Sequence, residues 1–461
     1  DESSYSRSPG SWFSLIESSS TVNVPAVPGL ADSNRKRFIG FRVLFNSRFY
    51  YPVLAVLFLD LGLSATQYTL LNFVWAIVIV LAEVPSGALA DRVGRRPLII
   101  AAAICMVLEM SLLLAAPLNG GLTLLLFCLA NRTLSGFGEA LASGADESLS
   151  YDSFAVESRG NEWPDVLADV MHWQSFGLLL AMLIGAAVYD PHFMNSIMAS
   201  IGSNLRIDQG LALRFPIALN LISAMVVLWL AFRMREPAAI STLPQATSHP
   251  ATGWQGIVDA GAWILRTPVA LFVIVGGVLI DSVIRLFLTF GSAFYRLIDL
   301  PEASFGLIGG AMAGLGMLVS PMARHLVRSG SLLRNFIILA ALTLLGLVGV
   351  ALKIPLWGVL FVIPLAAAMT GLGYIVSNTL NAQVHSAHRA TVLSFKGLVF
   401  NLGYGFASLM FALALRAMNG DGSSEQAFAS AIDVLPLWLL GTLVLLALVF
   451  RCHRAELDTK P

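Results

Sequence analysis

The sequence is short of charge. Only 12% of its 461 residues are Asp, Glu, Lys or Arg, and 57% are hydrophobic, whereas a soluble domain usually carries about 25% charged residues. A soluble protein of this size could not cover its surface with so few charged groups, but a protein surrounded by lipid needs no such cover. The composition therefore predicts a polytopic membrane protein.

Other absences exclude further classes of protein. The 28 basic and 28 acidic residues balance, so the net charge indicates no nucleic-acid partner. The three cysteines, Cys105, Cys128 and Cys452, are far apart and two lie in apolar runs, which argues against a disulfide framework or a metal site. The sequence has no GxxxxGK[ST] phosphate loop, no HExxH and no CxxC. We therefore expect no enzymatic activity, no metal and no bound cofactor.

What is present is a series of long apolar runs. A bilayer core needs roughly 20 apolar residues per helical span, and this criterion gives about twelve spans. The expected spans are 41–63, 68–90, 97–117, 122–143, 166–188, 211–232, 269–290, 305–326, 336–352, 356–380, 392–418 and 427–450. Residues 1–40 are rich in Ser and Pro and lack an early apolar core, so we interpret them as a cytosolic tail and not as a cleavable signal peptide.

The spans fall into two halves that are interpreted as repeats. A shift of about 237 residues places LVSPMARHLVRSG, from Leu318, near LAEVPSGALADRVG, from Leu81. Residues 41–233 and 268–450 are each expected to form a six-helix bundle. The cytosolic segments would be the linker 234–267, with an amphipathic helix after Trp254, and the tail 451–461. Loop Lys and Arg concentrate on the side of both termini, which predicts that both termini are cytosolic.

A charged stretch, EVPSGALADRVGRRP at residues 83–97, separates the second and third spans. Gly94 permits a tight turn, and Gly87 removes a side chain so that another helix can approach closely. Asp91 can accept hydrogen bonds from a helix amino terminus, where the helix dipole favours an anion. The basic residues of this loop, which would anchor it in the cytosol or merely follow the positive-inside rule, are Arg92, Arg95 and Arg96.

Within this stretch, GALADRVGRRPLI at residues 87–99 resembles the signature loop of the major facilitator superfamily, G-x-L-x-D-R-x-G-R-R/K, at every fixed position. The resemblance implies two six-helix bundles that rock about a central cavity, and hence a monomeric secondary transporter, located in a bacterial inner membrane. It also implies a cytosolic latch in the outward-open state. Asp91 would face residues 390–394 at the start of the eleventh span, and Arg92 would bond an acidic residue after the fourth span. The candidates for that acidic residue are Asp146, Glu147 and Asp152.

Ionisable groups at membrane depth are costly, so each is a candidate functional residue. Arg132, Glu139 and Asp146 recur every seven residues in and after the fourth span, which places them on one helix face. Arg132 is the only basic residue expected near the midplane of the first half. It would bind an anionic group of the solute, or a carboxylate when the cavity is empty. A structural ion pair between helices is the alternative.

The other spans contribute further candidates. Glu109 in the third span lies at a depth similar to that of Arg132, although the family resemblance makes this span peripheral. Asp281 and Arg285 in the seventh span are four residues apart and can pair on one helix face, so a ligand role and a self-satisfied pair are equally open. Weaker polar candidates in the tenth and eleventh spans are Asn378, Asn401 and Tyr404.

The sequence thus predicts an all-α membrane protein that moves a small organic solute by alternating access. Proton coupling is the favoured energy source, with Glu139 or Asp281 carrying the proton. Two alternatives remain open: a uniporter whose buried charges are structural, and a non-transporting solute sensor. The fifth span lacks the G-P pair of the family's drug antiporters, and no P-E-T or P-E-S sugar-porter motif follows the sixth, so the solute and the direction of transport are open.

Overall fold

The computed structural model describes residues 29–118, 120–237, 254–384, 389–418 and 424–451. Within these ranges the chain is helical and has no strand, which confirms the all-α prediction. Most of the two expected tails and the first half of the expected linker, including Cys452, lie outside the described residues.

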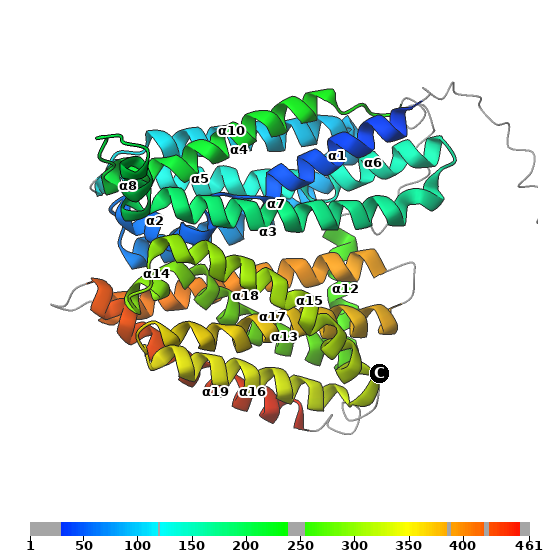
Figure 1. Cartoon of the computed structure of the whole chain (residues 1–461). Coiled ribbons are helices and arrows are strands. Elements are labelled where there is room, and N and C mark those ends of the chain that lie inside the picture. The colour runs from blue at the N-terminus through cyan, green and yellow to red at the C-terminus, as the bar shows by residue number, and fades with distance from the viewer. Residues whose placement is uncertain (1–28, 119, 238–253, 385–388, 419–423, 452–461) are drawn as a thin grey trace, which may run out of the picture.

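The long helices run nearly parallel in two bundles (Figure 1). The first bundle contains α1 (Leu30–Asn46), α2 (Leu54–Asp60), α3 (Ala65–Val93), α4 (Arg95–Ala115), α5 (Gly121–Ala142), α7 (Trp163–Tyr189) and α10 (Arg214–Arg233). The second bundle contains α13 (Pro268–Thr289), α14 (Gly291–Leu297), α15 (Phe305–Ser329), α16 (Leu332–Ala351), α17 (Val362–Gln383), α18 (Arg389–Met418) and α19 (Ser424–Val449). The shorter helices are α6 (Ala145–Val156), α8 (Pro191–Ser200), α9 (Gln209–Ala212) and α12 (Trp254–Arg266), the last of which packs on α13 and α18.

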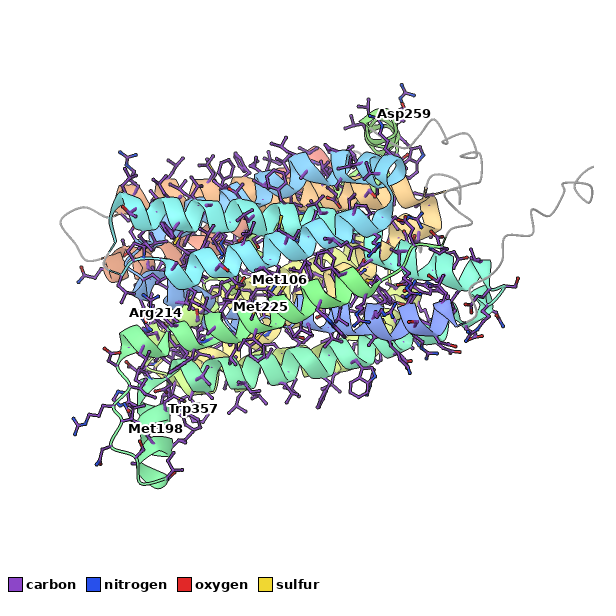
Figure 2. The ribbon with its side chains drawn as sticks, turned by 90° about the horizontal axis from the view of Figure 1, so that it is seen from above. Met106, Met198, Arg214, Met225, Asp259 and Trp357 are labelled. Atoms are coloured by element: carbon purple, nitrogen blue, oxygen red, sulfur yellow. The ribbon has the colours of Figure 1, made fainter. Side chains whose placement is uncertain are left out.

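The molecule has two distinct ends. We call the end at which α1 begins and α19 finishes the terminal end; it also carries α6 and α12 (Figure 1). We call the other end, which carries α2, α8 and α14, the opposite end. Figure 2 shows Met198 of α8 and Trp357 toward the opposite end and Asp259 of α12 toward the terminal end.

The lateral surface is apolar, as a bilayer requires. Met225 and Trp229 of α10 are 51% and 56% exposed, and Val444 and Leu448 of α19 are 59% and 63% exposed. Ten described helices are long and apolar enough to cross a membrane. Two of the twelve expected spans are not among these ten helices: the first, which is interrupted, and the fourth, which carries Arg132 and Glu139. The count of twelve therefore stays a prediction.

The prediction that residues 41–63 form one continuous helix is wrong. It is split into α1 and α2 by a non-helical segment around Arg48, followed by Pro52, which has no amide proton to donate. The break is accommodated by α7 and α10. The amide of Phe49 donates to Asn220 Oδ1 at 2.8 Å, and the Phe49 carbonyl lies so close to Gly185 that a Cβ there would stand 1.7 Å from its oxygen.

The two halves are related as the repeat predicts. Ala55 and Ser292 are 237 residues apart, and Ser292 Oγ accepts from the amides of Ala55 and Val56 at 3.0 and 3.2 Å. Such contacts between equivalent positions indicate a pseudo-twofold axis between α2 and α14. The equivalent helices α3 and α15 each contain an internal proline, Pro85 and Pro321.

Candidate functional site

A cavity of about 450 Å³ lies at the terminal end. Its wall comes from α1, α3, α5 and α6 of the first bundle and from α18 of the second. Its lining residues are Arg42, Phe45, Asn46, Trp75, Ile79, Glu83, Glu139, Ala140, Ala142, Ser143, Gly144, Asp146, Glu147 and Asn401. The cavity therefore brings the predicted residues Glu139, Asp146, Glu147 and Asn401 together, although they come from three different helices.

The prediction that Arg132, Glu139 and Asp146 lie on one face of one helix is wrong for Asp146, which is not part of α5. Gly144 adopts a left-handed conformation, with φ 73°, and ends the helical register after α5. Asp146 therefore begins the separate helix α6. Asp146 is buried and forms an ion pair with Arg42, whose Nε lies 2.7 Å from Asp146 Oδ2, while Arg42 Nη2 lies 3.3 Å from Glu147 Oε2. Burial raises the pKa of Asp146 to about 6, and the positive charge of Arg42 opposes that rise.

Arg132 on α5 is a buried charge with unsatisfied donors among the described residues. Its side chain is buried and its guanidinium stacks over the Phe58 ring, 4.8 Å from the centroid. Nε and Nη2 have no hydrogen-bond partner among the described residues. The guanidinium is close enough to Tyr68 and to Tyr404 of the second bundle to interact with them electrostatically. Arg132 thus faces the other bundle with unused donors.

The expectation that Arg132 is the only basic residue deep in the first half is wrong, because Arg48 is buried there as well. Arg48, at the break after α1, is buried and forms an ion pair with buried Glu109 of α4. Arg48 Nε also donates to the Phe45 carbonyl at 3.0 Å. Neither Glu109 nor Arg132 is among the residues that line the cavity. Glu109 has a structural partner inside the first bundle, whereas Arg132 has no ion-pair partner among the described residues.

The second bundle contributes the expected pair on α13. Arg285 Nη2 lies 2.7 Å from Asp281 Oδ2, and Arg285 Nη1 donates to Asn401 Oδ1 at 3.0 Å. The guanidinium also lies over the Tyr404 ring, 5.4 Å from its centroid. Tyr404 in turn packs edge-on against Trp75, with ring centroids 6.4 Å apart. Asp281, Arg285, Asn401 and Tyr404 thus form one group that reaches the cavity wall at Asn401 and Trp75.

Lys396 on α18 was missed by the sequence reasoning. Its ammonium group donates to Ser377 Oγ of α17 at 3.0 Å, lies over the Phe400 ring, and interacts electrostatically with Asp281. Asn378, next to Ser377, is half-buried. Lys396 lies inside the expected span 392–418, and Arg48 lies inside 41–63. Both could have been found from the sequence, because any charged residue within a span is a candidate functional residue.

The signature stretch at residues 87–99 contains the end of α3, the turn at Gly94 and the start of α4. Gly94 has φ 91°, a value that favours glycine, and Glu236 Oε1 accepts from the Arg95 amide at 2.8 Å. In this state no atom of the described residues lies within 4 Å of the position that a Cβ of Gly87 would take, so the close helix approach expected there stays a prediction.

The acidic candidates near the loop have other partners in this state. Asp146 and Glu147 pair with Arg42, and Asp152 forms an ion pair with Arg95, while Arg92 is exposed. The side chains of Asp91 and of residues 389–391 are not among those described. The latch belongs to a state in which the terminal end is closed, so it stays a prediction.

The opposite end is closed by polar contacts between the bundles. Asp60, at the end of α2, receives Arg296 of α14 in a bidentate ion pair, with N–O distances of 2.6 and 2.8 Å. Asp60 also accepts from the Tyr189 hydroxyl and from Gln209 Nε2, and Arg296 pairs with Glu302. The protein is therefore closed at the opposite end and hollow at the terminal end.

Comparisons with known proteins agree with this architecture. A crystal structure of the nucleoside transporter NupG aligns with a TM-score of 0.69 at 12% identity and covers 91% of this chain and 99% of that one. A bacterial homologue of the human lysosomal transporter Spinster, in an inward-facing and unoccupied conformation, aligns with a TM-score of 0.60 at 18% identity and covers 91% and 94%. A mutant of the peptide transporter POT aligns with a TM-score of 0.59 at 13% identity and covers 90% and 94%. At these identities the likeness shows the fold alone.

The sequence itself matches no curated protein. It does match the family model described as Major Facilitator Superfamily over residues 38–408. This range includes the signature loop and both bundles, and it spans well over half of the chain. The protein therefore belongs to the Major Facilitator Superfamily and is a membrane transporter with that family's fold.

Proposed function

We propose that this transporter moves a small organic solute with an anionic group, that it works by alternating access, and that it is coupled to protons. The observation that carries the proposal is the unsatisfied state of Arg132 between the bundles. Arg285 there pairs with Asp281 and Lys396 donates to Ser377, while Glu83 and Glu139 line the cavity. The buried guanidinium of Arg132 lies over a ring and has donors without a hydrogen-bond partner among the described residues. A buried positive charge is costly unless an anion offsets it.

Arg132 is the proposed binding group for the solute. Arg285 already pairs with Asp281, and Lys396 donates to Ser377, whereas Arg132 has two donor nitrogens without a hydrogen-bond partner among the described residues. A guanidinium presents a planar fork of donors that matches a carboxylate or phosphate. Trp75, which lines the cavity, would supply aromatic surface for the organic part of the solute.

Two carboxylates are candidates for the coupling proton. Glu139 lines the open cavity and has no ion-pair partner among the described residues, so it can exchange protons with water that enters from the terminal end. Asp281 pairs with Arg285, and protonation would release that arginine for the solute. A uniporter would use neither exchange, and its flux would not respond to a proton gradient.

The test uses purified protein and then proteoliposomes. Thermal stabilisation by compounds of different charge identifies the solute class, and anionic compounds should give the largest shifts. Arg132→Ala should abolish this stabilisation while the protein remains folded. If Arg132→Ala unfolds the protein and Arg132→Lys transports normally, Arg132 is structural. If Glu139→Gln and Asp281→Asn both keep the wild-type pH profile of flux, neither carries the proton.

We further propose that the terminal end faces the cytosol, which makes this structure the inward-facing state. The support is the concentration of loop arginines at that end. In a cysteine-free background, cysteine at Asn204, in the loop after α8, should react with an impermeant maleimide added to intact cells. Cysteine at Gly160, near the start of α7, should react only after lysis. The reverse pattern would overturn the orientation.

A further inference from the structure

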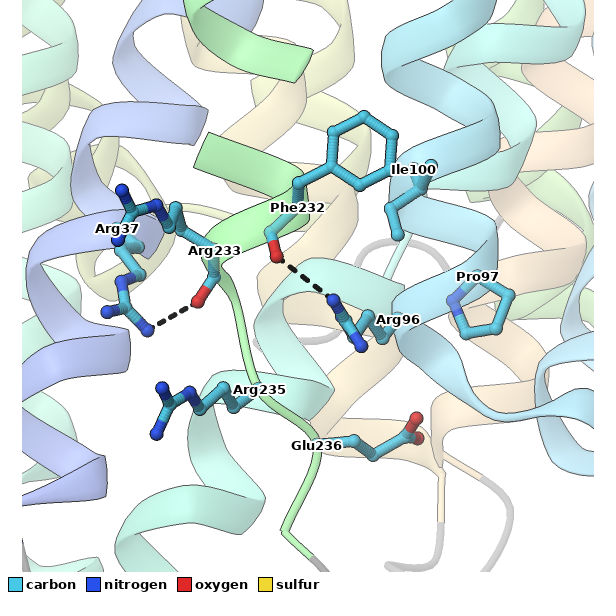
Figure 3. A pocket seen from close by; sticks show the side chains of 8 residues that line it. All are labelled: Arg37, Arg96, Pro97, Ile100, Phe232, Arg233, Arg235 and Glu236. Atoms are coloured by element: carbon cyan, nitrogen blue, oxygen red, sulfur yellow. Dashed lines mark hydrogen bonds between the residues drawn. The ribbon is translucent and has the colours of Figure 1, made fainter. Parts of the chain in front are cut away.

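A second pocket, of about 840 Å³, lies at the terminal end of the first bundle. It shares no lining residue with the cavity described above. Figure 3 shows the guanidinium groups of α1, of α4 and of the chain leaving α10 gathered around one space. The lining residues are Arg37, Arg96, Pro97, Ile100, Phe232, Arg233, Arg235 and Glu236.

The four arginines of this pocket differ from others at the same end. Arg35, Arg42, Arg95 and Arg159 each pair with a carboxylate. None of the four pocket arginines has an ion-pair partner among the described residues; two of them instead donate to main-chain carbonyls. Arg37 donates to the Arg233 carbonyl, and Arg96 Nη2 donates to the Phe232 carbonyl at 3.0 Å (Figure 3).

The single carboxylate in the pocket is already engaged. Glu236 Oε1 accepts from the Arg95 amide, at the start of α4. Arg96 Nε is buried without a hydrogen-bond partner among the described residues. Burial lowers the pKa of Arg37, and the charges of Arg235 and Arg233 lower it further. The cluster therefore carries unbalanced, mutually repelling positive charge that an anion would relieve.

The chemistry of the pocket fits a phosphate group. Several guanidinium forks can donate to the oxygens of one phosphate, and phosphate and carboxylate are the anions that arginine binds bidentately. The apolar part of the lining is also informative. Ile100 and Phe232 belong to the transmembrane helices α4 and α10, and Phe232 is 53% exposed. Exposed apolar side chains beside a basic pocket at a helix end suit a lipid whose head group is anionic.

We propose that this pocket binds a phosphate group, presented by an anionic phospholipid of the surrounding leaflet or free in solution. The experiment measures lipid binding to the full chain in detergent by native mass spectrometry. The probes are phosphatidylglycerol, phosphatidylcholine and inorganic phosphate. The wild-type protein should retain phosphatidylglycerol at least tenfold more tightly than phosphatidylcholine, whose choline cancels the phosphate charge.

The variants decide whether this pocket is the site. Arg233→Gln with Arg235→Gln should weaken phosphatidylglycerol binding at least tenfold. The matched control is Arg324→Gln with Arg328→Gln, two exposed arginines of α15 at the same end, and it should bind as the wild type does. Competition by millimolar inorganic phosphate would identify free phosphate as the ligand, and its failure would identify the lipid. Equal binding of the two lipids, or equal loss in both double variants, would overturn the proposal.

Discussion

At the scale of the residue, two buried arginines of the first bundle differ in their partners. Arg48 and Glu109 neutralise each other inside the first bundle. Arg132, on the neighbouring helix α5, lies over the Phe58 ring and has donors without a hydrogen-bond partner in the described part of the chain. Removing one member of a buried pair leaves an uncompensated charge. Removing a charge that has no partner in the protein leaves no uncompensated charge behind. The two arginines should therefore respond to mutation in opposite ways.

We expect Arg48→Met or Glu109→Leu alone to destabilise the protein by roughly 3–5 kcal/mol, because each leaves its partner unpaired in the interior. The double variant should recover most of that loss, since no buried charge remains. Thermal unfolding of the three variants measures the coupling. Single variants that unfold like the wild type but no longer transport would instead assign Glu109 to the transport cycle.

Asp146 should make stability depend on pH. Its pKa is raised from 3.8 to about 6, so between these pH values the folded protein holds a proton that the unfolded chain releases. The free energy of unfolding therefore falls as pH rises through this window, by on the order of 1–3 kcal/mol. Asp146→Asn removes this contribution. Relative to that variant, the wild type should lose stability between pH 4 and 6.5 and then level off. Parallel curves would contradict the assignment.

At the scale of the element, the interrupted first span shows how one helix shapes another. The break at residues 47–53 exposes main-chain groups at membrane depth, where each unsatisfied group is costly. Asn220 of α10 accepts from one amide of the break, and Gly185 of α7 lets the Phe49 carbonyl approach. The break thereby places Arg48 against Glu109.

We expect Gly185→Ala to destabilise the protein by at least about 1–3 kcal/mol, the usual cost of overpacking, because the new methyl would overlap the Phe49 carbonyl. Gly441→Ala in α19 is the matched control, since no atom lies within 4 Å of its Cβ position. This control should be neutral or slightly stabilising because alanine favours a helix. The two melting temperatures give the comparison, and equal values would show that the break can move away from α7.

The sequence could predict those elements that depend on local pattern. Apolar runs located most spans, and the loop at residues 87–99 indicated the family. Breaks were harder: Gly144 and Pro52 were visible, but whether a glycine or proline ends a helix depends on contacts such as that of Phe49 with Asn220. Pairings such as Arg48 with Glu109 or Asp60 with Arg296 join residues 61 and 236 positions apart, and residue spacing carries no sign of them.

At the scale of the whole molecule, the proposed alternating access makes this structure one of two states. Contacts between bundles close the opposite end, with Asp60 and Arg296 at their centre, while the cavity remains at the terminal end. The pseudo-twofold axis passes near Ser292 and Ala55 and runs along the helices, between the bundles. Rocking of the bundles about an axis perpendicular to it, in the membrane plane, would separate Asp60 from Arg296 and bring α3 toward the start of α18. Contacts that exist only in one state set the balance between the two.

Asp60→Asn should therefore shift the protein toward opening of the opposite end. The substitution keeps an oxygen acceptor but removes the charge that holds Arg296. A change of about 1–2 kcal/mol would alter the ratio of the two states roughly 5–30-fold. Spin labels at Leu205 and Trp357, both exposed at the opposite end, should report longer distances. Labels at Gly160 and Arg328, at the terminal end, should report shorter ones.

Asp60→Arg combined with Arg296→Asp restores an ion pair of reversed polarity and should return both distance distributions toward the wild type. Unchanged distances in Asp60→Asn would mean that the apolar contacts around Phe58, Tyr68 and Phe290 close this end without help from the ion pair.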